Sequence, residues 1–237
     1  MTDPLRDLPL ADRLICALDV DGMEAAAAMV QKLDGVISFF KVGILLHLAA
    51  GSDILRFLLE RGKRVFLDLK YYDIPETVEK AVAHAARLGI SFLTIHGNTR
   101  IIEHAVAARA DSQLRLLAVT ALTSLDEADI KAMGYPCDVA ELVMSRVRAA
   151  ASSGCDGVVC SPQEIAAIRR EVGNDLIVVT PGIRPAASDK GEHKRLAGPA
   201  DAIRAGSDFL VVGRPILEAP DPRAAAAAII REMETGA

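Results

Sequence analysis

The chain has 237 residues and a formal net charge of −5. This length suits a single α/β barrel, and a net acidic chain without basic clusters does not fit a nucleic-acid-binding surface. The four cysteines (Cys16, Cys137, Cys155 and Cys160) form no close C-x-x-C pair, so we expect reduced thiols rather than a zinc site or a disulfide framework.

Neither the N-terminal residues nor the apolar runs predict a membrane or export segment. The start, MTDPLRDLPLADR, contains acids and prolines but no apolar core, so we expect no signal peptide. The longest apolar run, residues 37–51, includes Lys41 and His47 and is too short to span a bilayer. We therefore expect a soluble, cytoplasmic protein with no membrane partner and no nucleic-acid partner.

Short apolar runs rich in β-branched residues alternate with Ala-rich segments along the chain. The predicted strands cover residues 14–20, 36–42, 64–69, 91–96, 115–120, 157–160, 176–180 and 208–213. The predicted helices lie near residues 22–33, 44–61, 75–88, 99–110, 138–152, 162–171, 196–205 and 221–234. Units of about 30 residues predict an α/β fold, a single (β/α)8 TIM-barrel domain over residues 1–237.

A doubly wound open sheet would show the same alternation, so the placement of polar residues has to separate the two folds. Polar side chains stand at or just past the C-terminal ends of the predicted strands, among them Asp19, Lys41, Asp68, Lys70, His96 and Arg214. Barrel enzymes build their sites from many strands at this end, whereas an open sheet concentrates function at one switch point. The pattern favours a barrel with its active site at the C-terminal mouth.

The segments after the seventh and eighth strands carry features of a phosphate site. Gly182 and Gly213 would let the backbone approach a ligand closely, and Arg214 could bind phosphate oxygens bidentately, with Arg184 as a second candidate. Ordinary Gly/Pro turns with solvated arginines are the alternative. Residues 183–195 lack a hydrophobic period, and we interpret them as a lid over a phosphorylated ligand.

Acids and lysines alternate at the ends of the first three predicted strands. In a barrel, Asp19, Lys41, Asp68 and Lys70 would converge at one mouth. Buried charges are costly unless they are paired, so this alternation predicts a preorganised network that could stabilise a transition state. Asp19 could instead cap the helix that follows it.

Purely structural interpretations also exist for the other charges. Asp73 precedes IPE and could cap the next helix, with Glu76 completing a capping box. Asp68 and Lys70, two positions apart on a strand, could form a plain ion pair. Lys41 could extend from the core to water.

Six segments together resemble one enzyme family. DLKYYDIPET (68–77) resembles the D-x-K-x-x-D signature of orotidine 5′-phosphate decarboxylases. The segments ALDV (17–20), FFKVG (39–43), LTS (122–124), VTPGIRP (179–185) and VVGRPI (211–216) occur in the order of that family. The resemblance implies decarboxylation of orotidine 5′-monophosphate to uridine 5′-monophosphate, in pyrimidine biosynthesis, without a metal or an organic cofactor.

The resemblance also implies catalytic roles. Lys70 would protonate the pyrimidine carbon that loses carbon dioxide, Asp68 would lie against the leaving carboxylate, and Lys41 would connect the network to the ribose. A homodimer is implied, in which the site of one subunit receives three residues from the other, namely Asp73, Ile74 and Thr77.

Substrate-binding roles follow in the same way. Asp19 would bind a ribose hydroxyl and Thr123 would lie near the pyrimidine. The residues implied around the phosphate are Pro181, Arg184, His193, Gly213 and Arg214. His193 stands where the family commonly carries Gln, and an imidazole cannot offer both ends of an amide.

Two other functions stay open. A metal-dependent phosphosugar lyase of the same barrel group would share Asp68, Lys70 and Asp73, but such relatives tend to carry an acid where Lys41 stands, and a lysine there would repel a divalent cation. A non-catalytic nucleotide-binding barrel is the second alternative. His96 is interpreted as a supporting or structural residue, because the implied mechanism needs no imidazole.

Overall fold

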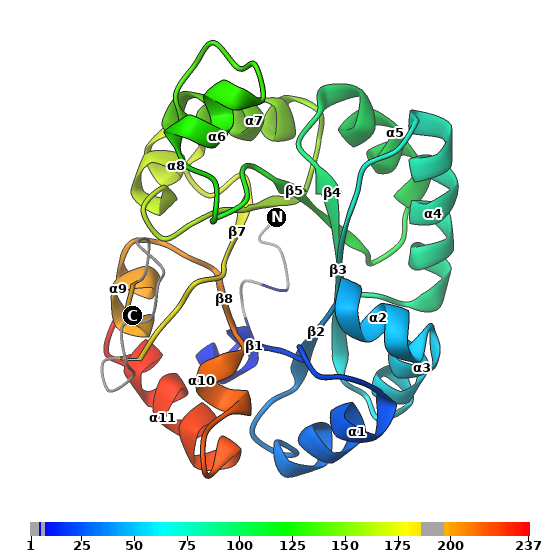
Figure 1. Ribbon diagram of the computed structural model, residues 1–237, viewed down its shortest axis with the longest axis vertical. Helices are drawn as coiled ribbons and strands as arrows, with labels where there is room; N and C mark the ends of the chain where they lie inside the picture. Colours follow the sequence, from blue (N-terminus) through cyan, green and yellow to red (C-terminus); the bar gives the residue numbers. More distant parts are fainter. Residues whose placement is uncertain (1–4, 6–7, 186–196) are drawn as a thin grey trace.

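The computed structural model describes residues 5, 8–185 and 197–237. The strands are β1 (Leu14–Ala17), β2 (Phe39–Gly43), β3 (Arg64–Tyr71), β4 (Phe92–His96), β5 (Arg115–Val119), β6 (Gly157–Val159), β7 (Ile177–Thr180) and β8 (Phe209–Val212). Each strand pairs in parallel with the next, and β1 also pairs with β8, so the sheet closes into a barrel (Figure 1). The predicted (β/α)8 architecture is confirmed, and the open sheet is excluded.

Helices surround the barrel on its outside (Figure 1). They are the 3-10 helix η1 (Leu10–Arg13) and the α-helices α1 (Met23–Lys32), α2 (Ile44–Ala50), α3 (Asp53–Glu60), α4 (Pro75–Leu88), α5 (Thr99–Arg109), α6 (Glu127–Ala132), α7 (Val139–Ser152), α8 (Ile165–Val172), α9 (Pro199–Arg204), α10 (Arg214–Leu217) and α11 (Pro222–Glu234). In the described part of the chain, no helix has the length and apolarity needed to cross a membrane.

The helices differ from the prediction in two respects. The single helix expected over 44–61 is two helices, because Gly51 takes a positive φ of 58° and ends α2. The short helices η1, α6 and α10 were not predicted. Asp126 begins α6 with a capping box, in which its side chain accepts from the backbone of Asp129 while Asp129 accepts from the backbone of Asp126.

Alternation along the strands separates two hydrophobic clusters. Side chains on the outer face of the strands pack under the helices and form the larger cluster. The inner face carries a smaller cluster that includes Phe39, Phe66, Phe92 and Phe209, in which the centroids of neighbouring rings lie 5.0–6.0 Å apart. We call these four rings the aromatic floor. They fill the barrel interior, so the barrel is a packed core rather than a pore.

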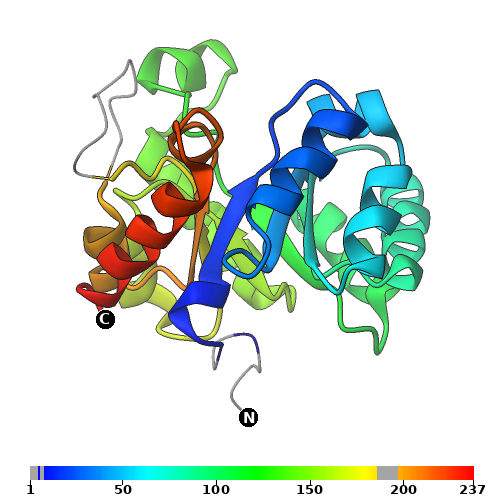
Figure 2. The ribbon, with the colours of Figure 1, turned by 90° about the horizontal axis from the view of Figure 1, so that it is seen from below.

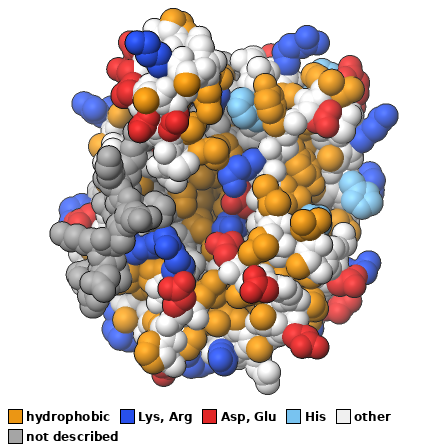
Figure 3. Space-filling view, viewed as in Figure 1, with side chains coloured by type: hydrophobic (Ala, Val, Ile, Leu, Met, Phe, Trp, Pro, Cys, Tyr) orange, Lys and Arg blue, Asp and Glu red, His pale blue; other side chains and the backbone are white. Residues whose placement is uncertain are grey.

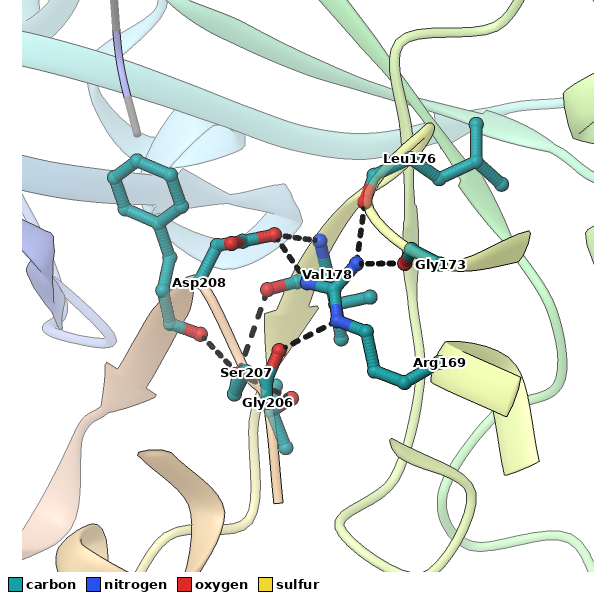
Figure 4. Close-up of polar contacts among 9 residues, drawn as sticks. Arg169, Gly173, Leu176, Val178, Gly206, Ser207 and Asp208 are labelled. Atoms are coloured by element: carbon teal, nitrogen blue, oxygen red, sulfur yellow. Dashed lines mark hydrogen bonds and ion pairs between the residues drawn. The ribbon is translucent and has the colours of Figure 1, made fainter. Parts of the chain in front are cut away.

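A half-buried arginine, Arg169, ties helix α8 to strands β7 and β8 (Figure 4). The Arg169 guanidinium donates to the carbonyls of Gly206 (2.8 Å) and Leu176 (2.9 Å) and to Oδ2 of Asp208 (2.5 Å). Asp208 Oδ2 also accepts from the backbone N–H of Val178 at 2.7 Å. These contacts stand at the N-terminal ends of β7 and β8, where barrels support stability rather than chemistry. Figure 2 shows the barrel from the side, with the N terminus at one end and the loop carrying α6 at the other.

Candidate active site

The inner face of three neighbouring strands changes from apolar to polar as it approaches the mouth. On each strand a phenylalanine of the aromatic floor is followed two positions later by a polar residue on the same face: Phe39 and Lys41 on β2, Phe66 and Asp68 on β3, Phe92 and Thr94 on β4. Because side chains alternate with a period of two along a strand, the polar groups form one layer directly above the aromatic floor.

Four charged side chains form a continuous chain in this layer, and we call them the charged quartet: Asp19, Lys41, Asp68 and Lys70. The Lys41 Nζ lies 3.0 Å from Oδ1 of Asp19 and 3.7 Å from Oδ2 of Asp68. The Lys70 Nζ donates to Oδ1 of Asp68 at 2.8 Å. Figure 3 shows basic and acidic side chains together in the hollow at the middle of this face. The predicted convergence of these residues is confirmed in geometry.

Burial is graded along the charged quartet. The side chains of Lys41 and Asp68 are 12% and 14% exposed, whereas those of Lys70 and Asp19 are 36% and 54% exposed. A charge withdrawn from water is tolerated only with an opposite partner, and here Lys41 and Asp68 each have two. Lys41 thus reaches toward the mouth but ends between two carboxylates rather than in open water. The quartet presents Lys70 and Asp19 to any ligand in the mouth.

The strand that carries Asp68 and Lys70 is irregular between them. Pairing of β3 with β4 runs through Leu67 opposite Leu93 and resumes at Tyr71 opposite Ile95. Within this interruption Lys70 adopts a φ of 50°, a left-handed value that L residues rarely take. Such backbone outliers concentrate at functional sites. The simple i, i+2 strand geometry assumed from the sequence is therefore wrong, although the two side chains do meet.

Two glycines leave space beside the quartet. A Cβ on Gly43 would lie 3.1 Å from Nζ of Lys41, and one on Gly213 would lie 3.5 Å from Oδ2 of Asp19. The Gly213 position also joins the quartet to the start of α10, where Arg214 and Pro215 form the first turn. Gly43 was not predicted as a site residue, because a glycine at a strand end reads as an ordinary turn.

Two arginines stand near each other at the β7 and β8 side of the mouth. Burial, and next the positive charge of Arg214, lower the pKa of Arg184. The Arg184 side chain donates to the Ile183 carbonyl at 3.1 Å, and its backbone N–H donates to Ala197. A bound anion would offset the unfavourable effect of Arg214 on the charged form of Arg184. Pro181, half-buried, belongs to the same segment after β7.

The segment after β3 lies outside the charged quartet. Asp73, Ile74 and Thr77 are exposed. Asp73 Oδ1 accepts from the backbone N–H of Ile74 at 2.6 Å. Helix α4 begins with Ile74 as its N-cap and has no side-chain cap, so the capping box of Asp73 and Glu76 is wrong. The capping alternative for Asp19 is wrong as well, because Gly22 is the N-cap of α1.

His96 lies in a side cavity of about 230 Å³ that Asn98, Tyr135 and Arg146 also line. Its ring stacks on Tyr72, with centroids 4.1 Å apart, and its buried Nδ1 has no hydrogen-bond partner among the described residues. Burial, and secondarily the charge of Arg146, lower the pKa of His96 to about 4. The imidazole is therefore neutral near pH 7, and the supporting role of His96 stays a prediction.

The other predicted site residues lie in the loops after β5 and β7. Thr123 is exposed in the loop between β5 and α6. His193 and most of the predicted lid lie outside the described residues. All four cysteines are free thiols. Over residues 8–185 and 197–237, no group of three or more His, Cys, Asp or Glu side chains is placed to hold a metal ion.

Comparison with known proteins places this geometry in a family. The model of the family described as "Orotidine 5'-phosphate decarboxylase / HUMPS family" matches residues 12–229. Orotidine 5'-phosphate decarboxylase of Nitrobacter winogradskyi is 52% identical over 222 residues, covering 94% of this chain and 92% of that protein. The protein of that name from Rhodopseudomonas palustris is 48% identical over 227 residues, covering 96% of each.

A solved structure agrees. The crystal structure of orotidine 5'-phosphate decarboxylase from Lactobacillus acidophilus superposes with a TM-score of 0.83 at 38% identity, covering 94% of this chain and 99% of that chain. With the barrel, the charged quartet and these matches in agreement, the chain belongs to the orotidine 5'-phosphate decarboxylase / HUMPS family.

Proposed function

We propose that the chain decarboxylates orotidine 5′-monophosphate to uridine 5′-monophosphate and carbon dioxide, a step of pyrimidine biosynthesis, without a metal or organic cofactor. The observation that carries the proposal is the charged quartet. In it the Lys70 ammonium group contacts the Asp68 carboxylate and is exposed to a ligand in the mouth. The names of the relatives, at about half identity over most of the chain, support the same reaction.

Lys70 is the proton donor. When the bond between the ring and the carboxylate breaks, carbon dioxide leaves and the electron pair stays on a ring carbon that cannot delocalise it. The Lys70 ammonium stabilises this charge and then transfers a proton from Nζ to the carbon. A charge pair at about 4 Å contributes around 4 kcal/mol at an effective dielectric near 20, or about a thousandfold in rate. Lys70 is therefore a large part of the catalysis but not all of it.

Asp68 acts in two ways. It accepts a hydrogen bond from the Lys70 ammonium at 2.8 Å, which fixes the direction of that group. It also places a negative charge beside the substrate carboxylate, and that repulsion is relieved as carbon dioxide departs. Binding energy gathered elsewhere on the substrate has to hold the two carboxylates together.

That binding energy comes from the ribose and phosphate ends of the nucleotide. Asp19 binds a ribose hydroxyl, and Lys41 joins the ribose to the quartet. Around the phosphate, Gly213 and the first turn of α10 supply backbone donors, while Arg184 and Arg214 supply charge. The lowered pKa of Arg184 supports this assignment, because a bound phosphate would relieve the arginine pair. Pro181 and His193 complete the phosphate side, and Thr123 contacts the pyrimidine.

The active unit is a homodimer in which each site is completed by Asp73, Ile74 and Thr77 of the other subunit. Support comes from a run of exposed apolar side chains on α2 and on the segment after β3. Ile44, Leu45 and Leu48 are 61%, 53% and 86% exposed, and Tyr72 and Ile74 are 67% and 63% exposed. Large apolar side chains exposed to this extent favour association. The four free thiols support a cytoplasmic location.

The two alternatives are less favoured. A metal-dependent phosphosugar lyase would need a divalent cation near Asp68, where the ammonium groups of Lys41 and Lys70 already lie within 3.7 Å and 2.8 Å of the carboxylate. Those cations would repel the metal. A non-catalytic nucleotide-binding barrel would not need the preorganised, partly buried quartet.

Turnover decides among the three functions. Purified chain, treated exhaustively with a chelator, is mixed with orotidine 5′-monophosphate, and the loss of ultraviolet absorbance is followed. We expect full activity after chelation. Turnover of the nucleotide that survives chelation excludes the metal-dependent lyase and the non-catalytic barrel together, and no turnover with or without added divalent metal would contradict the decarboxylase.

A further inference from the structure

Thr94, in the middle of β4, contacts both members of the Asp68 and Lys70 pair. Its Oγ1 accepts a hydrogen bond from the backbone N–H of Lys70 at 2.9 Å and donates one to Oδ1 of Asp68 at 3.0 Å. The Thr94 residue is 0% exposed. One hydroxyl therefore makes two contacts of opposite polarity, and both its hydrogen and a lone pair have a defined partner.

The irregular pairing of β3 explains why a side chain is needed at this position. Between the Leu67–Leu93 and Tyr71–Ile95 pairs, β3 has three residues (68–70) and β4 has one, Thr94. The extra residues of such a bulge lose their ladder partners. The Thr94 hydroxyl replaces the missing acceptor for the N–H of Lys70, at the residue whose φ is 50°.

The same hydroxyl orients the carboxylate. Oδ1 of Asp68 accepts from Thr94 and from Lys70 Nζ, while Oδ2 faces Lys41 Nζ at 3.7 Å. With both oxygens occupied, the carboxylate cannot rotate without breaking a contact. Thr94 thus fixes the backbone from which Lys70 extends and also the anion that its ammonium group contacts.

We propose that Thr94 is a positioning residue for the decarboxylation, holding the strained Lys70 backbone and the Asp68 carboxylate so that the ammonium meets the reacting carbon. The proposal rests on the proposed function. A purely structural role would be to satisfy a buried N–H, and its loss would lower stability without changing the chemical step. Misplacement of a reacting group by about 1 Å can cost about a hundredfold in rate, so the two roles differ in kcat.

The test compares Thr94→Val, which keeps the shape but loses the hydroxyl, with Thr94→Ser, which keeps the hydroxyl. Thr120→Val is the matched control: Thr120 is also 0% exposed, and its Oγ1 donates to the Val159 carbonyl at 2.9 Å, facing β6 rather than the quartet. For each variant, kcat, KM and the melting temperature are measured. Thr94→Ala serves as the hydroxyl-free variant if Thr94→Val does not fold.

We expect Thr94→Val to lower kcat by about ten- to a hundredfold while KM changes less than about threefold. Thr94→Ser should recover most of kcat, and Thr120→Val should lose melting temperature without losing kcat. The proposal is overturned if Thr94→Val keeps the wild-type kcat, if Thr94→Ser is as slow as Thr94→Val, or if Thr120→Val is equally slow. Failure of both hydroxyl-free Thr94 variants to fold under conditions where Thr120→Val folds would assign Thr94 to the fold alone. A wild-type chain without turnover would contradict the proposed function instead.

Discussion

The Lys70 ammonium donates to Oδ1 of Asp68 at 2.8 Å even though only one residue separates the two on β3. The contact forms across an interrupted part of the strand, where Lys70 has a φ of 50°. The pair is therefore a product of backbone distortion as well as of residue choice, and the distortion directs the amine into the mouth.

Removing the amine should nearly abolish the reaction. We expect Lys70→Ala to lower kcat at least about a thousandfold, because the charge at the reacting carbon and the proton donor are lost together. Initial rates of nucleotide turnover provide the measurement. Lys63→Ala is the matched control, since Lys63 pairs with Asp34 and is not part of the quartet. A Lys70→Ala enzyme that turns over at the wild-type rate would contradict the proposed mechanism.

Mixing two inactive variants tests the shared site. Lys70→Ala and Asp73→Asn chains are unfolded together and refolded at a ratio of one to one. If Asp73 acts across the interface of a two-fold dimer, about a quarter of the sites are intact and activity returns. Each variant refolded alone is the control. Recovery at no mixing ratio would mean that both residues serve the same subunit's site.

The arginine pair should act mainly on binding. Loss of a charged hydrogen bond to phosphate costs about 1.5–3 kcal/mol, so we expect Arg214→Ala to lower kcat/KM by roughly ten- to a hundredfold. Steady-state kinetics over a range of substrate concentrations measures this change. Arg204→Ala, which removes an exposed ion pair with Asp201, should change kcat/KM little. Equal effects of the two substitutions would count against phosphate binding at Arg214.

His96 should make the fold weaker in mild acid. Its pKa is lowered to about 4 in the folded chain, whereas the ordinary value is 6.5. Between these values the unfolded chain binds a proton that the folded chain does not, so stability is complete above pH 6.5 and falls as the pH approaches 4. Melting temperatures across this range should fall less steeply for His96→Gln. His84→Gln, at an exposed helical position, should keep the wild-type slope. If His96→Gln keeps the wild-type slope, His96 does not contribute to the loss of stability in acid.

The amino-acid sequence predicts much of this molecule because strand period and strand order are local properties. The β-branched runs and the polar residues at their ends are enough to predict the barrel, its mouth and the meeting of Lys41 with Asp19 and Asp68. Helix boundaries agree within a few residues, and α4 begins and ends where expected.

What the sequence does not reveal depends on pairing between strands. The interruption of β3 has no glycine or proline to announce it, and Thr94 reads as an ordinary β-branched strand residue until β3 is placed beside it. At Asp73 the sequence predicts a contact that does not form: the residue looks like a helix cap, but α4 begins after Ile74 and has no side-chain cap. In contrast, the Asp126 capping box of α6 is a local signal that could have been recognised.

The aromatic floor gives the barrel a single entrance. Because the rings of Phe39, Phe66, Phe92 and Phe209 close the axis beneath the charged layer, a nucleotide that enters the mouth has to leave by the same opening. Product and incoming substrate therefore use the same opening. Slow release of the product nucleotide would delay the next turnover, however fast the bond-breaking step is.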